Sequence, residues 1–120
     1  MADLRVTTLT GQETTLPHAV VGEFKNSQRG QLIAPGDDSY EEARQVWNAN
    51  IDRRPGLICR PAGVADVINA VNLARDRNLL VSVRGGAHSF SGTCVCNGGL
   101  VIDMSLMKGI RVDPVRRTAR

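Results

Sequence analysis

Apolar residues between positions 64 and 76 recur with the spacing of an α-helix. The positions that follow this spacing are Val64, Val67, Ile68, Val71 and Ala74. They share one face of a helix with 3.6 residues per turn, and we expect this face to pack against a core. Apolar runs at residues 56–59 and 79–83 flank the helix, and each has the length of a buried strand. The pattern predicts a strand, helix, strand unit whose two strands are parallel.

Weaker patterns occupy the rest of the chain. Residues 14–28 are weakly helical, and residues 32–34 fit a brief strand. Ser39-Tyr40-Glu41-Glu42 has the form of a capping box, which would open a helix to about Asn48 and place Trp47 in the core with Val67 and Val71. Short strands are expected at residues 100–102 and 109–112, and another begins at residues 116–120. This order of elements indicates an α+β fold.

We expect residues 1–30 to form a helical lead-in and residues 31–120 to form one unit. The chain has 120 residues, of which 42% are hydrophobic, and this is enough for about one domain. The last expected strand stops at its first residues, which would leave the ladder groups of its partners unpaired. We therefore expect residues 31–120 to be the N-terminal portion of a longer, truncated domain.

Charge and cysteine content exclude several classes of protein. The net charge of +3 is scattered, and only 3% of residues are aromatic, so a nucleic-acid partner is not expected. No stretch reads as a membrane span or a signal peptide, and we expect no membrane partner. Cys94 and Cys96 are too close for a comfortable disulfide, and with Cys59 they make an odd count. A reducing, cytoplasmic location, no metal site and packed thiols are the simplest expectations.

The most distinctive stretch is Gly85-Gly86-Ala87-His88, which follows the apolar run at residues 79–83 directly after Arg84. Glycines at the end of a strand let the backbone approach a ligand, and successive N–H groups form an anion site suited to phosphate. Arg84 would add positive charge, and hydroxyl groups follow at Ser89, Ser91 and Thr93. The stretch matches neither the P-loop nor the dinucleotide fingerprint. The alternative is a tight turn, in which the glycines serve only to allow the backbone dihedral angles that the turn requires.

Three further side chains, His88, His18 and Asp103, are of types that can carry chemistry. His88 ends the glycine stretch, where its ring nitrogen would be held beside a bound cofactor, whereas His18 has no such context. Asp103 follows an apolar strand and precedes Met104-Ser105, a position typical of a carboxylate that caps a turn rather than a catalytic one.

A succession of motifs in residues 32–120 resembles a known family. The stretches that carry the resemblance are Arg53-Arg54-Pro55, Cys59-Arg60-Pro61, Val64-Ala65-Asp66-Val67, Val83-Arg84-Gly85-Gly86-Ala87-His88-Ser89, Gly98-Gly99-Leu100-Val101-Ile102-Asp103-Met104-Ser105 and Arg111-Val112-Asp113-Pro114. Together they are similar to the first half of the FAD-binding domain in FAD-linked oxidases of the vanillyl-alcohol oxidase superfamily. The branch they resemble most contains berberine bridge enzyme and its bacterial relatives.

The resemblance implies a fold, a cofactor and a set of contacts. The fold would be the first subdomain of a two-part FAD-binding domain, a small α+β unit with a βαβ element followed by short strands. The stretch from Arg84 to Ser89 would wrap the FAD pyrophosphate, with Gly92 continuing the cradle, and His88 would be bonded covalently to the 8α carbon of the flavin. Ala87 stands where many members have a third glycine. Cys94 and Cys96 do not match the cysteine of doubly linked members.

The expected function is that of the FAD-binding portion of an oxidoreductase that takes a hydride from an alcohol-type or amine-type carbon of a small-molecule substrate. No catalytic residue for the substrate is assigned within this chain, which we expect to be inactive alone. A non-catalytic nucleotide- or anion-binding module and an inactive truncated fragment are the alternatives.

Overall fold

The computed structural model describes residues 2–120. Its strands are β1 (Leu4–Thr7), β2 (Glu13–Leu16), β3 (Gln31–Ile33), β4 (Leu57–Arg60), β5 (Val81–Arg84), β6 (Leu100–Asp103), β7 (Val112–Asp113) and β8 (Thr118–Ala119). Its helices are α1 (His18–Ser27), α2 (Tyr40–Ala43), α3 (Val64–Asp76) and the 3-10 helix η1 (Met104–Leu106). The mixture of helices and strands confirms the α+β class. No helix within residues 2–120 is long and apolar enough to cross a bilayer.

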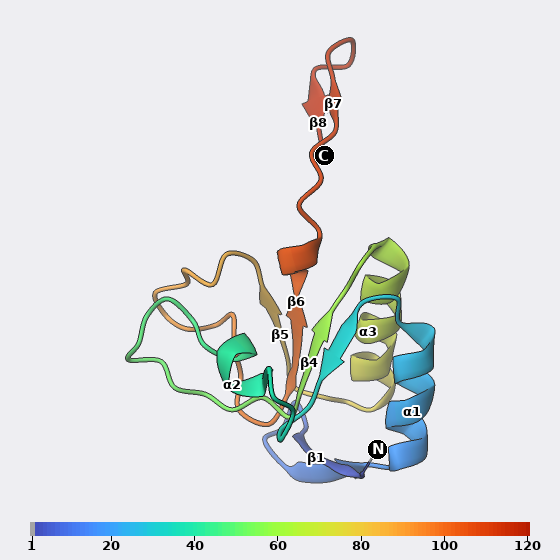
Figure 1. Ribbon diagram of the computed structural model, residues 1–120, viewed down its shortest axis with the longest axis vertical. Helices are drawn as coiled ribbons and strands as arrows, with labels where there is room; N and C mark the ends of the chain where they lie inside the picture. The colour runs from blue at the N-terminus through green and yellow to red at the C-terminus, as the bar shows by residue number, and fades with distance from the viewer. Residues whose placement is uncertain (1) are drawn as a thin grey trace.

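A four-stranded sheet in the order β3-β4-β6-β5 forms the centre of the molecule (Figure 1). β4 and β5 both pair in parallel with β6, and β3 pairs antiparallel with β4. The expectation of parallel strands on either side of α3 is therefore confirmed. The two strands are not neighbours, however, because β6 lies between them and pairs through Leu100 with both Leu57 and Val81.

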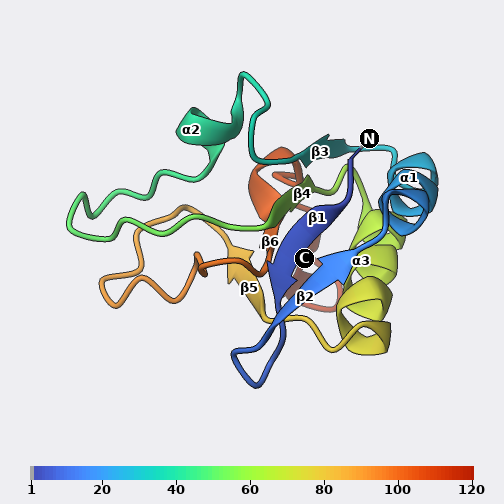
Figure 2. The same cartoon turned by 90° about the horizontal axis from the view of Figure 1, so that it is seen from below.

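The central strands β4 and β6 are buried on both faces, whereas Val81 and Val83 of the edge strand β5 are exposed. Different elements cover the two faces of the sheet. Helices α1 and α3 lie on one side, while α2 and two long loops lie on the other (Figures 1 and 2). Successive side chains of a strand point to opposite faces. In β4, Cys59 therefore packs in the cluster beneath the helices, and Ile58 packs with Tyr40 in the cluster beneath the loops. Burial on both faces explains why these strands are continuous apolar runs.

Helix α3 forms where the spacing predicts it, but of the predicted apolar face only Ala74 is buried. Val64, Ile68 and Val71 are exposed, Val67 is only partly buried, and the buried positions are Asp66, Ala70 and Ala74. Asp66 is 2% exposed because its carboxylate accepts three backbone N–H groups, from Arg29, Gly30 and Ala62 at 2.9–3.0 Å. Burial alone would raise the pKa of Asp66, but these hydrogen bonds outweigh it and hold the pKa below its ordinary value.

The helix expected from residue 39 to about residue 48 is much shorter in the structure. Helix α2 spans only Tyr40–Ala43, and the Ser39 side chain makes no capping hydrogen bond. Trp47 lies beyond the helix and is 73% exposed, so its assignment to the core is wrong. Tyr40 is buried, and its hydroxyl donates to the carbonyl of Pro55 at 2.6 Å. This bond attaches α2 to the segment that leads into β4.

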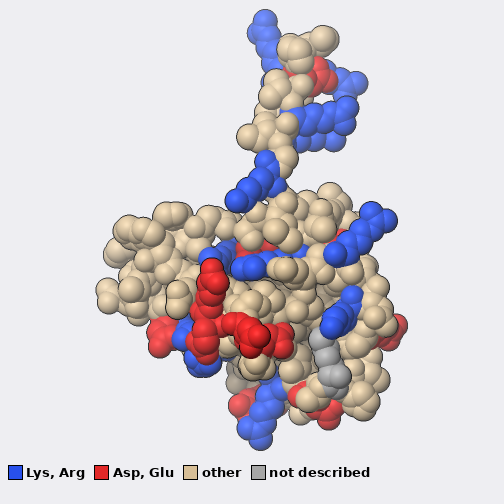
Figure 3. Space-filling view, in the orientation of Figure 1, with Lys and Arg blue, Asp and Glu red and all other residues tan. Residues whose placement is uncertain are grey.

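The two ends of the chain add strand pairs outside the central sheet. β1 and β2 form an antiparallel pair before α1, so only the His18–Ser27 part of the expected N-terminal helix is helical. β7 and β8 form a hairpin that stands away from the body (Figure 1). Basic residues outnumber acidic ones on this hairpin, whereas acidic residues gather around α2 (Figure 3). The division of the chain near residue 30 stays a prediction.

Candidate functional site

The glycine stretch lies where the parallel strands end. Arg84 is the last residue of β5, and Gly85, Gly86, Ala87 and His88 follow it into a long loop. β4, β6 and β5 run in one direction, so their carboxyl ends meet at a single edge of the sheet. In open sheets of this kind, ligands bind outside the carboxyl ends of the strands.

Neither turn geometry nor packing requires the first two glycines. Gly85 and Gly86 have negative φ angles, a range open to any residue. A Cβ added to Gly85 would meet no atom within 4 Å, and one added to Gly86 would meet only Cδ2 of His88 at 3.3 Å. Gly92 differs, because its φ is +75° and a Cβ there would lie 2.8 Å from Cγ2 of Ile51. The tight-turn alternative therefore explains Gly92 but not the bare backbone of Gly85 and Gly86.

Ala87 occupies the left-handed conformation that glycine would favour. Its φ is 63°, and its side chain is 6% exposed. For a residue with a Cβ this conformation costs about 1–2 kcal/mol, which the surrounding contacts must offset. The carbonyl of Ala87 accepts the backbone N–H of Trp47 at 2.9 Å, so a second segment holds this strained residue in place.

That second segment, residues 43–54, lies along much of the loop between β5 and β6, residues 85–99, which we call the glycine loop. The Arg84 guanidinium donates to the carbonyl of Ala43 at 2.6 Å. The side-chain amide of Asn48 donates to the backbone carbonyl of Phe90 at 3.4 Å. The guanidinium of Arg53 donates to the carbonyls of Gly92 at 2.6 Å and Val95 at 3.1 Å. The loop is therefore held on two sides, by β5 and by this segment.

His88 is exposed beside the bare backbone, with one aromatic neighbour. The centres of the His88 and Trp47 rings lie 5.7 Å apart, and their planes are tilted by 32°. A side-chain carbon at Gly86 would touch the imidazole, so the ring lies close to the glycine pair. His18, the first residue of α1, contacts Asp3 instead.

The two arginines beside the loop have no acidic partner within residues 2–120, a property that they share with several other arginines of the chain. Among the ion pairs of residues 2–120, carboxylates pair with Arg44, Arg54, Arg60, Arg75 and Arg116. Arg53 and Arg84 are absent from these pairs, and both donate to backbone carbonyls of or beside the loop. Two uncompensated positive charges and bare backbone N–H groups suit a ligand with phosphate groups.

The polar and sulfur-containing side chains after His88 divide into an exposed set and a buried set. The hydroxyl of Ser89 lies 3.4 Å from that of Ser91 and 3.2 Å from that of Thr93, so the structure brings the three predicted hydroxyls together. Cys94 and Cys96 are 7% and 8% exposed, which confirms that they are packed thiols. Burial raises the pKa of Cys96. Both cysteines are reduced and unpaired, as is Cys59.

Asp103 acts as the sequence predicts, as a capping carboxylate. It is fully buried, accepts the backbone N–H of Ser105 at 3.0 Å and pairs with Nε of Arg60 at 2.9 Å. Within residues 2–120, no cluster of histidine, cysteine and acidic side chains is arranged to hold a metal ion.

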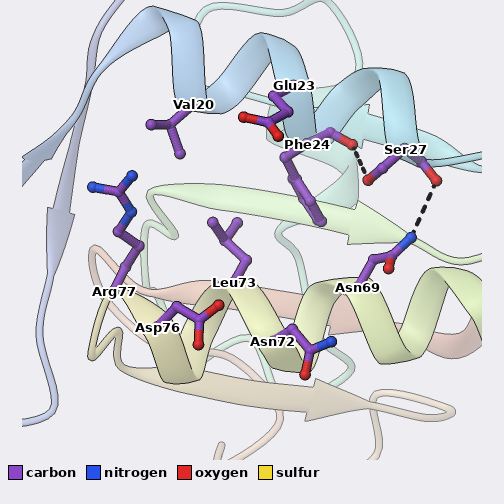
Figure 4. A pocket seen from close by; sticks show the side chains of 9 residues that line it. All are labelled: Val20, Glu23, Phe24, Ser27, Asn69, Asn72, Leu73, Asp76 and Arg77. Carbon is purple, nitrogen blue, oxygen red and sulfur yellow. Dashed lines mark hydrogen bonds between the residues drawn. The ribbon is translucent and has the colours of Figure 1, made fainter.

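A separate groove of about 310 Å³ lies between α1 and α3 (Figure 4). Val20 and Phe24 reach into it from α1, and Leu73 from α3, while the amide of Asn69 donates to the carbonyl of Ser27 at 3.3 Å across one end. It contains none of the predicted site residues. The glycine loop is therefore the candidate site.

The sequence indicated the loop but not the segment beside it. The pattern predicts that Trp47 lies in the core, and Arg53 stands out only as part of a family motif. One signal was available for Trp47: it is followed by Asn48-Ala49-Asn50, which is typical of a turn and not of a helix that continues into a core. No comparable signal separates Arg53 from Arg54.

Comparison with known proteins identifies the family. A family model described as "FAD binding domain" matches residues 55–120. An FAD-linked oxidoreductase of Dictyostelium discoideum is 36% identical over 100 residues, covering 82% of this chain and 22% of that protein. The (R)-6-hydroxynicotine oxidase of Paenarthrobacter nicotinovorans is 35% identical over 94 residues, covering 78% of this chain and 20% of that oxidase.

Solved structures agree with the sequence relatives. The crystal structure of 6-hydroxy-D-nicotine oxidase from Arthrobacter nicotinovorans superposes with a TM-score of 0.69 at 36% identity, over 72% of this chain and 19% of that one. The BBE-like 1 protein of Physcomitrella patens superposes with a TM-score of 0.73 at 28% identity, over 82% of this chain and 22% of that one. The chain thus spans about a fifth of the length of these relatives. It belongs to the FAD binding domain family of FAD-linked oxidoreductases, and its cofactor is FAD.

Proposed function

We propose that the glycine loop holds the pyrophosphate of FAD in a flavin-dependent oxidoreductase. The backbone N–H groups of Gly85 and Gly86 would face the phosphate oxygens, and Arg84 would contribute charge. Ala87, His88, Ser89 and Gly92 would complete the cofactor contacts. The observation that carries this proposal is the open space above Gly85, where neither conformation nor packing explains the missing side chain.

We also propose that His88 is the covalent anchor of the cofactor. It is exposed, lies next to the glycine pair, and is the only histidine near the loop within residues 2–120. Forming the link replaces a C–H bond of the 8α methyl group and the N–H bond of the imidazole with one C–N bond. The two electrons and two protons released reduce dioxygen to hydrogen peroxide, which balances the step.

The reaction of the whole protein is proposed from the family. When bound, FAD supplies the hydride-accepting chemistry, and the substrate would be a small molecule with an alcohol-type or amine-type carbon. The role of the residues described above is to bind and orient the cofactor. A cytoplasmic location is proposed from the three reduced cysteines.

Acid precipitation of the natural polypeptide that carries these residues tests the proposal. Covalently bound flavin stays in the pellet and colours it yellow, whereas reversibly bound flavin stays in solution. His88→Ala should release the colour into solution, and His18→Ala, the matched control, should retain it in the pellet. Wild-type protein whose flavin washes out freely in acid would show that His88 is not an anchor. Protein that holds no flavin would contradict the binding proposal as well.

A further inference from the structure

Trp47 is a large apolar side chain that the core does not use. It is the only tryptophan of the chain, and 73% of it is exposed. Burying an aromatic ring of this size is strongly favourable, so an exposed one that contacts a functional loop calls for an explanation. The aromatic ring beside it is that of His88, with the ring centres 5.7 Å apart.

The backbone fixes this arrangement on both sides of Trp47. Its own N–H donates to the carbonyl of Ala87, the residue that precedes His88. Before it, the carbonyl of Ala43 accepts the guanidinium of Arg84, and after it, the amide of Asn48 donates to the loop. The two rings therefore meet because their segments are joined, and a change of the indole leaves the joining bonds in place.

We propose that Trp47 is a positioning residue for His88, which restrains the imidazole beside Gly86 in the orientation needed for the bond to FAD. This inference rests on the proposed function of His88. An exposed imidazole turns about two side-chain torsions, and a misplacement of a reacting group by about 1 Å can slow a reaction about 100-fold. A neighbouring ring removes part of that freedom before the cofactor binds. The separation of 5.7 Å between the ring centres lies within the range of about 4.5–7 Å found for interacting aromatic pairs.

The first experiment measures the ring contact without FAD. The chain has two histidines and one tryptophan. The indole ring current should shift the proton resonances of His88 in a nuclear magnetic resonance spectrum and leave those of His18 unchanged. Trp47→Leu should remove the shift, and Trp47→Phe should retain part of it. Thermal melting of both variants should match the wild type, because the side chain is mostly exposed.

The second experiment measures how fast flavin becomes acid-stable when apoprotein is mixed with FAD. Trp47→Leu should slow attachment by roughly 10- to 100-fold, the cost expected of a displaced reacting group. Trp47→Phe should stay within about threefold of wild type, because an aromatic ring restores the contact. The noncovalent affinity for FAD should change less than the rate in both variants. A merely structural role of Trp47 would change melting instead of the rate.

The outcomes separate the two proposals. Attachment in Trp47→Leu at the wild-type rate, or His88 resonances that do not move in that variant, would overturn the positioning role alone. Wild-type protein that forms no acid-stable flavin, although its His88 resonances respond to Trp47→Leu, would overturn the covalent role of His88 and this inference with it. Slow attachment in Trp47→Leu with rescue by Trp47→Phe would support both.

Discussion

Gly85→Ala should affect the stability of the fold and the affinity for FAD in opposite directions. Gly85 has a negative φ angle, and an added Cβ would meet no atom within 4 Å. Alanine fits this conformation and restricts the unfolded chain. The free energy of unfolding should therefore stay unchanged or rise by about 0.4–1 kcal/mol. Chemical denaturation followed by circular dichroism measures this effect.

FAD affinity should change in the opposite direction. The added methyl group fills the space in which a phosphate oxygen would reach the backbone N–H. A hydrogen bond to a charged group contributes about 1.5–3 kcal/mol. Its loss would raise the dissociation constant for FAD roughly 10- to 150-fold, since every 1.4 kcal/mol is tenfold. Isothermal titration calorimetry of the two proteins with FAD gives the ratio.

Gly92→Ala is the matched control within the same loop. Its φ of +75° and the 2.8 Å approach to Ile51 make a side chain costly there. The left-handed conformation costs about 1–2 kcal/mol, and overpacking about 1–3 kcal/mol more. The variant should therefore unfold more easily by about 2–5 kcal/mol. If Gly85→Ala destabilised the chain as much as Gly92→Ala does, or left FAD affinity unchanged, the two glycines would serve only the turn. The proposal that they bind the FAD pyrophosphate would then be refuted.

Further predictions concern the buried carboxylate and the thiols. Asp66→Asn should destabilise the fold by about 2–4 kcal/mol, because an amide cannot accept all three N–H groups, whereas exposed Asp76→Asn should cost no more than about 0.5 kcal/mol in the same denaturation assay. Since the pKa of Asp66 is lowered on folding, its contribution to the free energy of unfolding is complete above about pH 4 and disappears as the pH falls through the folded pKa. The free energies of unfolding of the wild type and Asp66→Asn should therefore converge in acid. A difference between them that stays constant with pH would refute this. Cys94→Ser with Cys96→Ser should leave flavin attached through His88, with a small loss of stability; acid-soluble flavin in this double variant would show that the thiols take part.

The periodicity of α3 predicted a helix but could not show which stripe of it is buried. The apolar stripe of Val64, Ile68 and Val71 is exposed, while Asp66 is buried. A single sequence shows the polarity of each side chain, but burial depends on which backbone groups the fold places beside that side chain. Here two N–H groups from the distant residues Arg29 and Gly30 join the local N–H of Ala62 at the Asp66 carboxylate and make its burial favourable. No local pattern contains that convergence.

The sequence predicts only one of the two segments that form the candidate site, for a similar reason. The glycines of the stretch are consecutive in the sequence, so its lack of side chains can be recognised from the sequence alone. The segment at residues 43–54 reaches the loop only through contacts between residues about forty positions apart, such as Trp47 with Ala87 and Arg53 with Gly92. Such contacts are set by the strand order, in which β6 enters between β4 and β5. That order was not predicted, and the contacts could not be either.

The two adjacent arginines Arg53 and Arg54 show how the fold creates a positive site from a nearly balanced composition. Arg54 turns outward and pairs with Glu41, and together with Arg44 it lowers the pKa of that carboxyl to about 2. Its charge is therefore largely compensated. Arg53 turns inward and donates to carbonyls of the glycine loop, with no carboxylate partner among residues 2–120. A phosphate at the loop would thus meet charge that the protein has left uncompensated, which favours an anionic ligand over a neutral one at this position.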